Sequence, residues 1–206
     1  LVLVQENADG LVQNATTAQL PGALDTLYAD AAREDELGVA LKGESTHFRL
    51  WAPTAQRVQL CLYDRGDGPA TGLESMRFDR DTGIWSAQRP KLDGRYYRYA
   101  VQVFVRGTGL VRNLVTDPYS IGLTTDSKRS YIADLDARRL KPAGWDRHAA
   151  PRIPAQTDMS IYELHVRDFS IDDASVPPGD RGKYRAFTWT NSNGMRHLRG
   201  LADAGL

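Results

Sequence analysis

The stretches Arg57-Val-Gln-Leu-Cys-Leu62 and Tyr97-Arg-Tyr-Ala-Val-Gln-Val103 decide the fold of most of this chain. In both, apolar side chains recur at every second position, which is the period of a β-strand with one buried face. Strands of this kind pack in two layers and leave their outer faces wet. The two stretches therefore predict a layered β-structure.

Short segments of similar character continue on both sides, over residues 37–139. They are separated by turns rich in Gly and Asp at 64–69, 79–83 and 106–109. Repeated short strands with glycine-containing turns are typical of an immunoglobulin-like β-sandwich. We predict strands at 46–51, 57–63, 73–78, 84–87, 95–105 and 110–116.

The first 36 residues have a different pattern. Residues 1–15 predict a β-hairpin with its turn at Asn7-Ala-Asp-Gly10. Residues 23–33 carry apolar side chains at helical spacing, after Pro21-Gly22. Residues 1–36 therefore predict a hairpin followed by a helical segment.

Another pattern begins after a Pro-rich linker at 140–157. Apolar and polar side chains alternate over 162–166, and residues 193–205 have helical spacing with Ser192 as a candidate N-cap. Strand, long loop and helix make one β/α unit, whereas a barrel of eight units needs roughly 250 residues. Residues 158–206 therefore predict the first, incomplete β/α unit of a TIM barrel.

Three segments of this last part resemble the opening β/α unit of bacterial type I pullulanases, which are starch-debranching enzymes of the α-amylase superfamily. They are YELHVRDFS (162–170), SVPPGDRGKYRAFT (175–188) and HLRGLADAGL (197–206). FRLWAPTAQRVQLCLYD (48–64) and VTDPYS (115–120) resemble the carbohydrate-binding-module type of β-sandwich that precedes that barrel. LPGALDTLYADAA (20–32) resembles the connector before that sandwich, so the resemblance implies that residues 1–36 are the tail of a preceding domain and a helical connector. FRLWAPTA alone indicates an α-glucan-active enzyme, and YELHVRDFS with RGKYRAFT narrows the resemblance to pullulanases.

The resemblance implies a retaining, two-carboxylate glycoside hydrolase that acts on α-1,6-glucosidic branch points of pullulan, starch or glycogen. In that superfamily the catalytic Asp, Glu and Asp lie on the fourth, fifth and seventh barrel strands. No catalytic residue is therefore assigned here, and we expect this chain alone to be inactive. The implied partners are the α-glucan and the remainder of the barrel. The alternatives are a non-catalytic α-glucan-binding module, a domain-packing module, or an unrelated immunoglobulin-like interaction domain.

Five residues are candidates for a site. Aromatic rings stack on pyranose faces, so Trp85 and Trp189 are candidate substrate-binding residues, although core packing competes with this role. Glu163, His165 and Asp168 could form an acid/base group. Alternate residues of a barrel strand point inward, however, which favours a supporting role behind the active site.

The sequence predicts no metal site and no cofactor in this chain. The loop carboxylates Asp172, Asp173 and Asp180 lack the spacing of an EF-hand, so we expect them to be solvated. Calcium is left open for the complete enzyme only. The single cysteine, Cys61, lies at an apolar strand position and predicts a buried structural thiol.

Composition disfavours other classes of partner. Lys and Arg total 26 and so do Asp and Glu, which gives no bulk attraction to nucleic acid or to an anionic membrane. No apolar run approaches the roughly 18 residues of a membrane span. No signal peptide is visible in a chain that starts at Leu1. We expect a bacterial protein that is secreted or at the cell surface rather than cytoplasmic.

Overall fold

The computed structural model describes residues 2–17, 19–149 and 152–206, and the chain divides into two units, Leu1–Ala143 and Gly144–Leu206. Leu1 of the predicted hairpin and residues 150–151 of the predicted linker lie outside the described residues. The predicted domain limits at 37, 139 and 158 stay predictions.

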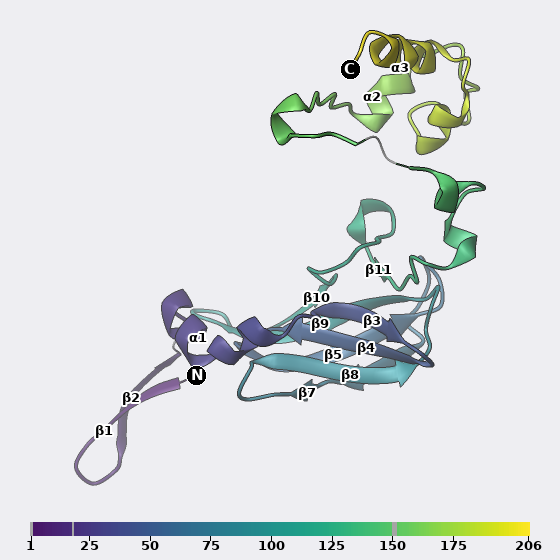
Figure 1. Cartoon of the computed structure of the whole chain (residues 1–206). Helices are drawn as coiled ribbons and strands as arrows, with labels where there is room; N and C mark the ends of the chain where they lie inside the picture. Colours follow the sequence, from purple (N-terminus) through teal and green to yellow (C-terminus); the bar gives the residue numbers. More distant parts are fainter. Residues whose placement is uncertain (1, 18, 150–151) are drawn as a thin grey trace. The chain divides into compact units, whose positions relative to one another are not determined.

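The first unit contains an antiparallel β-sandwich, which confirms the predicted fold class (Figure 1). One sheet consists of β5 (Ala55–Tyr63), β6 (Gly72–Ser75), β9 (Tyr96–Val105), β10 (Gly109–Val115) and β11 (Ser130–Tyr131). The other consists of β3 (Gly38–Lys42), β4 (Ser45–Trp51), β7 (Arg77–Phe78) and β8 (Ile84–Pro90). The strand orders are β10-β9-β5-β6, with β11 also paired to β9, and β3-β4-β8-β7.

The core lies between these two sheets. Val58, Leu60, Tyr97 and Tyr99 are fully buried, as their alternation in the sequence predicts. The rings of Phe48 and Tyr97 pack in a T-shaped contact with centroids 5.1 Å apart, so β4 of one sheet meets β9 of the other. The predicted burial of Cys61 is also confirmed.

The predicted strand at 73–78 is corrected to two strands in different sheets. Residues 72–75 form β6, which pairs with β5, whereas Arg77 and Phe78 form β7, which pairs with β8. Between them Met76 is buried, and its N–H donates to the Val58 carbonyl. The apolar pattern runs through the crossover because Met76 enters the core shared by both sheets. The sequence did not predict β3 and β11.

Asp117 is a buried hydrogen-bond centre beside this core. Its Oδ2 accepts from the Tyr97 hydroxyl at 2.6 Å and from the Tyr99 hydroxyl at 3.3 Å. Its Oδ1 accepts from the backbone N–H of Tyr119 at 2.8 Å, and its own N–H donates to Ser130 Oγ. The carboxylate therefore holds the chain after β10 against β9 and β11.

Arg129 closes the loop between β5 and β6. Its guanidinium donates to the carbonyls of Arg65, Asp67 and Gly68. The same group lies over the Tyr63 ring, 3.9 Å from its centroid. A loop that is rich in glycine is thus held by a side chain far along the chain.

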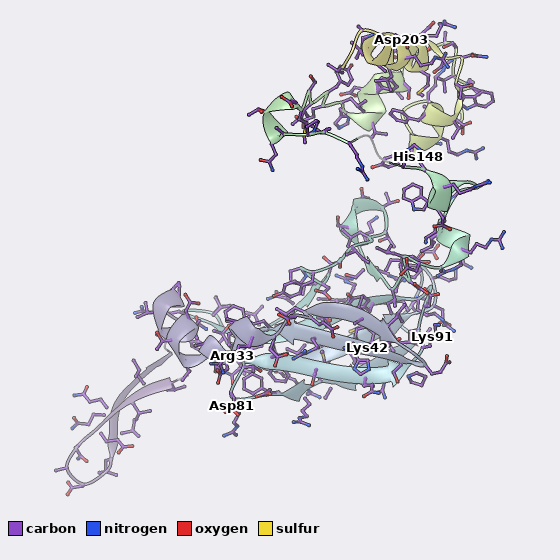
Figure 2. The ribbon with its side chains drawn as sticks, in the orientation of Figure 1. Arg33, Lys42, Asp81, Lys91, His148 and Asp203 are labelled. Atoms are coloured by element: carbon purple, nitrogen blue, oxygen red, sulfur yellow. The ribbon has the colours of Figure 1, made fainter. Side chains whose placement is uncertain are left out.

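The N-terminal segment forms the predicted hairpin, β1 (Val2–Glu6) and β2 (Val12–Thr17). Asn7 Oδ1 accepts from the N–H groups of Asp9 and Leu11 in its turn, and all β1 side chains are exposed (Figure 2). The predicted helix at 23–33 is instead α1 (Pro21–Leu27) and the 3₁₀ helix η1 (Ala29–Arg33). They separate at Tyr28, which is buried close to Gly83.

The second unit consists of helices and loops in the described residues. The helices are α2 (Val166–Ser170) and α3 (Asn193–Asp203), with the 3₁₀ helices η4 (Trp145–Arg147), η5 (Gln156–Asp158) and η6 (Tyr184–Thr188). The first unit also has η2 (Thr125–Ser127) and η3 (Arg138–Leu140). The predicted helix is confirmed as α3, and Ser192 Oγ accepts from the Met195 N–H as the predicted N-cap.

The predicted strand at 162–166 does not form. Residues 159–165 have no regular structure, and Val166 begins α2 instead. A strand needs a neighbour for its backbone N–H and C=O groups, and the described residues of this unit include no other strand. The alternation alone therefore does not produce the expected barrel strand.

The Asp173 carboxylate connects the long loop to α3 through hydrogen bonds. Its Oδ1 accepts from the N–H and the hydroxyl of Ser175 and from Asn193 Nδ2, and its Oδ2 accepts from the Gly194 N–H. The expectation of a merely solvated carboxylate is wrong here, because loop carboxylates readily accept nearby backbone N–H groups. Asp172 is exposed, as expected.

Acid is expected to loosen the start of α3. The hydrogen bonds from Ser175, Gly194 and Asn193 lower the pKa of Asp173 to about 2. An unfolded aspartate titrates near 3.9, so the ionised carboxylate stabilises the fold above that pH, and this contribution is lost as the pH falls toward about 2.

The Gly194 amide reports this loss. Its protection from hydrogen exchange, corrected for intrinsic rates, should fall between about pH 4 and pH 2 in the wild type. The acid-dependent step should be missing in Asp173→Asn and retained in the control variant Asp172→Asn. Identical pH profiles for the wild type and Asp173→Asn would contradict the role of this carboxylate.

Candidate functional site

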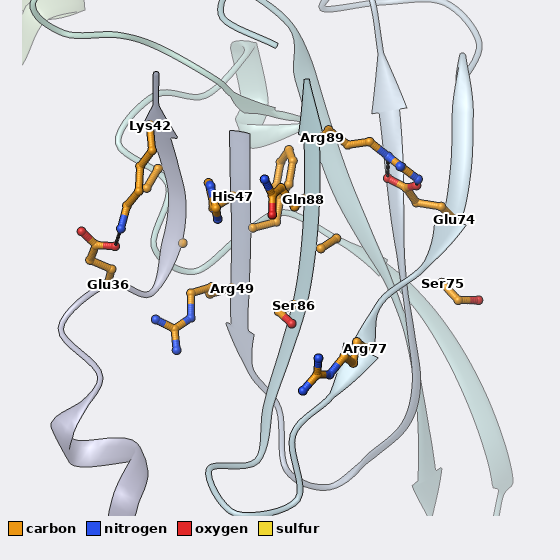
Figure 3. Close-up of a pocket in the computed structure, with 14 residues that line it drawn as sticks. Glu36, Lys42, His47, Arg49, Glu74, Ser75, Arg77, Ser86, Gln88 and Arg89 are labelled. Carbon is orange, nitrogen blue, oxygen red and sulfur yellow. Dashed lines mark hydrogen bonds and ion pairs between the residues drawn. The ribbon is translucent and has the colours of Figure 1, made fainter. Parts of the chain in front are cut away.

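A hollow of about 510 Å³ lies on the outer face of the β3-β4-β8-β7 sheet (Figure 3). Its lining is mainly polar and charged, and it includes Lys42, His47, Arg49, Arg77, Ser86 and Gln88. We call this hollow the polar groove. It lies on the wet side of the sheet, opposite the core.

Strand register places the lining residues in rows. Arg49 of β4 is paired with Ser86 of β8, which is paired with Arg77 of β7. His47 and Gln88 form the next row across β4 and β8. Neighbouring strands lie roughly 4.8 Å apart, and same-face residues along a strand roughly 6.6 Å apart, so the rows form a regular grid.

Ion pairs neutralise the cations at the edges of the groove. Lys42 pairs with Glu36, Arg89 with Glu74, and Arg49 with Glu34. The hydrogen bond from Lys42 is the main cause that lowers the pKa of Glu36. Figure 3 shows the Lys42–Glu36 and Arg89–Glu74 pairs on opposite sides of the groove.

The floor of the groove keeps unused hydrogen-bonding groups. Within the described part of the chain, His47, Arg77 and Ser86 make no side-chain hydrogen bond or ion pair. Gln88 donates through Nε2 to Ser45 Oγ at 3.1 Å, which leaves its carbonyl oxygen as an acceptor. The carboxylates of the groove, Glu36 and Glu74, are each paired with a cation. The arrangement suits binding of a polar molecule.

Comparison with known proteins shows which family and which proteins the chain resembles. Residues 36–120 match the family described as carbohydrate-binding module 48 (isoamylase N-terminal domain). The whole chain matches "Pullulanase 1, chloroplastic" of Arabidopsis thaliana with 39% identity over 210 residues, which is 21% of that protein. The chain is a pullulanase relative. The resemblance predicted from its motifs is confirmed.

Other pullulanases give the same result. The pullulanase of Klebsiella pneumoniae is 39% identical over 211 residues, which cover 100% of this chain and 19% of that protein. A crystal structure of Klebsiella pneumoniae pullulanase complexed with maltotriose superposes with a TM-score of 0.83, at 38% identity, over 100% of this chain and 20% of that one. This pullulanase relative therefore spans about a fifth of the length of the relatives it matches.

Trp85, the first predicted sugar-binding residue of this pullulanase relative, lies in the core. It is 7% exposed, its ring centroid is 4.8 Å from that of Phe78, and its Nε1 donates to the Ala52 carbonyl at 3.0 Å. A residue this deeply buried offers little surface on which a sugar could stack. Two successive buried residues, Ile84 and Trp85, begin β8, and this packing position explains the burial.

Trp189, the second predicted residue, is 42% exposed. Its Nε1 donates to Asp180 Oδ2 at 3.0 Å, and Arg185 Nε lies 3.5 Å from Asp180 Oδ1. Asp180 therefore anchors both side chains, and the expectation that it is merely solvated is wrong. Tyr184 in the same loop is also exposed. A sugar-binding role of Trp189 stays a prediction.

Glu163, His165 and Asp168 are only partly brought together. His165 Nδ1 lies 3.5 Å from Asp168 Oδ2, and Arg167 Nη1 lies 3.3 Å from Asp168 Oδ1. Glu163 makes no side-chain hydrogen bond or ion pair within the described residues. The supporting role predicted for the three residues depends on a complete barrel and stays a prediction.

Within the described residues, no group of three or more His, Cys, Asp or Glu side chains is placed to hold a metal ion. Among the helices of those residues, none is long and apolar enough to cross a membrane.

The sequence did not reveal the polar groove. Alternation in β4 does place His47 and Arg49 on the outer face. Their neighbours Gln88 and Ser86 lie 41 and 37 residues further along the chain, and only the register of β4 with β8 brings them together.

Proposed function

We propose that the protein containing this chain is a pullulanase-type glycoside hydrolase. It would cleave α-1,6-glucosidic branch points of pullulan, starch or glycogen by a retaining mechanism with two carboxylates. The observation that carries this proposal is the 39% identity to a pullulanase over 100% of the chain.

Within that enzyme, we assign the chain a non-catalytic part in holding α-glucan. The match of residues 36–120 to carbohydrate-binding module 48 supports this, as does the polar groove. The Klebsiella pneumoniae pullulanase was crystallised as a complex with maltotriose, so a short glucan is a ligand of that protein. The second partner we propose is the remainder of the catalytic barrel, because Ile161 is 80% exposed beside the segment predicted as a barrel strand.

The purified 206-residue chain is expected to bind α-glucan without hydrolysing it. Its migration in a native gel should slow when amylose or pullulan is cast into the gel, relative to an inert reference protein. No reducing sugar should appear during incubation with pullulan, whereas the complete protein should release it. Reducing sugar released by the chain itself would refute the non-catalytic assignment. Unchanged migration would refute glucan binding.

A further inference from the structure

The two outer faces of the sandwich differ in how their polar groups are used. On the β10-β9-β5-β6 face, Arg112 donates to Gln59 Oε1 at 3.2 Å, and Arg98 donates to the Leu114 carbonyl at 2.5 Å. In the polar groove, the floor groups of Arg77, His47 and Ser86 have no such partners among the described residues. The β3-β4-β8-β7 face therefore has a hollow whose floor groups are available to hydrogen-bond a ligand.

The charges around the groove favour a neutral ligand. Glu36 and Glu74 line it and Glu34 adjoins it, and each of the three neutralises a neighbouring cation. Three of the four Lys and Arg side chains of the lining are paired in this way, and only Arg77 has no ion pair among the described residues, so the groove attracts a charged ligand weakly. A neutral molecule with many hydroxyls can use both the donors and the acceptors of the lining, because a hydroxyl donates and accepts.

The scaffold behind the groove is rigid. His47 and Arg49 alternate along β4 with Phe48 and Leu50, which are buried in the core. Side chains on strands with a packed core behind them lose little freedom on binding, which favours affinity. The same outer face continues to Trp51, whose Nε1 donates to the Thr82 carbonyl at 3.0 Å and whose ring is partly exposed. This residue adds an apolar surface beyond the Arg49 row.

We propose that the polar groove binds a linear α-1,4-glucan chain, with Arg77, Ser86 and Gln88 hydrogen-bonding its hydroxyls. The inference rests on the proposed glucan-binding function and names the surface that performs it. The hollow has lining residues from all four strands of the sheet, so several sugar units meet it side by side. His47 and Trp51 flank the chain on β4.

The test is calorimetric titration of maltohexaose into the 206-residue chain and its variants. Arg77→Ala combined with Gln88→Ala should weaken binding by about tenfold or more, which corresponds to about 1.4 kcal/mol. Arg112→Ala, on the opposite outer face, is the matched control and should change the Kd by less than about twofold, well under that tenfold step. Circular dichroism and the thermal midpoint establish that each variant is folded.

The outcomes separate the two proposals. If the double variant binds maltohexaose with wild-type affinity, the polar groove is not the binding surface, while the proposal that the chain binds glucan still stands. A larger loss in Arg112→Ala than in the double variant also overturns it, and assigns binding to the other face. Absence of binding by the wild type overturns both proposals. In labelled wild-type protein, maltohexaose should shift the side-chain amide resonance of Gln88 and leave that of Gln59 in place, and the reverse pattern counts against the groove.

Discussion

Replacing Trp85 with alanine is expected to destabilise the sandwich by about 3–5 kcal/mol. The side chain is 7% exposed and belongs to the core that also contains Phe48, Tyr97 and Tyr99. Removing it leaves a cavity beside Phe78 and takes away one of the two hydrogen bonds that the Ala52 carbonyl accepts, the other coming from the Ala55 N–H. Urea denaturation followed by circular dichroism measures the loss.

Trp189→Ala is the control, because that ring is 42% exposed and lies in the other unit. It should leave the unfolding of the sandwich unchanged. A Trp85→Ala protein of wild-type stability that no longer binds glucan would show that this tryptophan serves the ligand rather than the core.

Replacing Asp117 with alanine is the second large effect, expected at about 2–6 kcal/mol because each buried polar group left without a partner costs roughly 1–3 kcal/mol. The change removes the acceptor for two hydroxyls, those of Tyr97 and Tyr99, and both residues are 0% exposed. It also frees the Tyr119 N–H. The free energy of unfolding from urea titration gives the size of the loss.

The pH dependence of Asp117 distinguishes its charge from its hydrogen bonds. Burial raises the pKa of Asp117, against the opposing effect of the hydrogen bonds from Tyr97, Tyr119 and Tyr99. The folded protein then holds the proton more tightly than the unfolded chain, so this group makes stability fall as the pH rises from about 3.9 through the raised pKa. The ionised carboxylate thus costs stability at neutral pH.

Asp117→Asn keeps an acceptor oxygen and removes the charge. Its stability relative to the wild type should therefore improve as the pH rises through this window, even if it starts lower. A stability difference that is independent of pH would show that the carboxylate titrates alike in the folded and unfolded states. Burial and the Asp117 charge raise the pKa values of Tyr97 and Tyr99, so both hydroxyls remain protonated donors throughout.

The sequence predicted the sandwich because alternation directly reports which face of a strand is buried. The rule succeeded for Val58 and Leu60, whose neighbouring strands are present. It failed for residues 162–166, which alternate equally well, because alternation does not report whether a partner strand exists. Local pattern and long-range pairing are separate requirements.

The candidate site was harder to predict for the same reason. An aromatic residue after a turn can face a ligand or the core, and the sequence around Trp85 contains no signal that distinguishes them. The polar groove depends on the register that sets Arg49, Ser86 and Arg77 in one row. That register follows from the pairing of distant strands, so no local stretch of sequence encodes it.

The hydrogen bonds that Arg129 donates to the loop at 64–69 have a consequence for biosynthesis. The Gly68 carbonyl and the arginine that binds it are 61 residues apart in the chain. A ribosome that adds about 5–20 residues per second needs about 3 to 12 s to synthesise that length of chain. The loop therefore leaves the ribosomal exit tunnel well before Arg129 does. During that interval the flanking strands, β5 and β6, can already pair, but the loop between them still lacks the Arg129 side chain that binds its carbonyls.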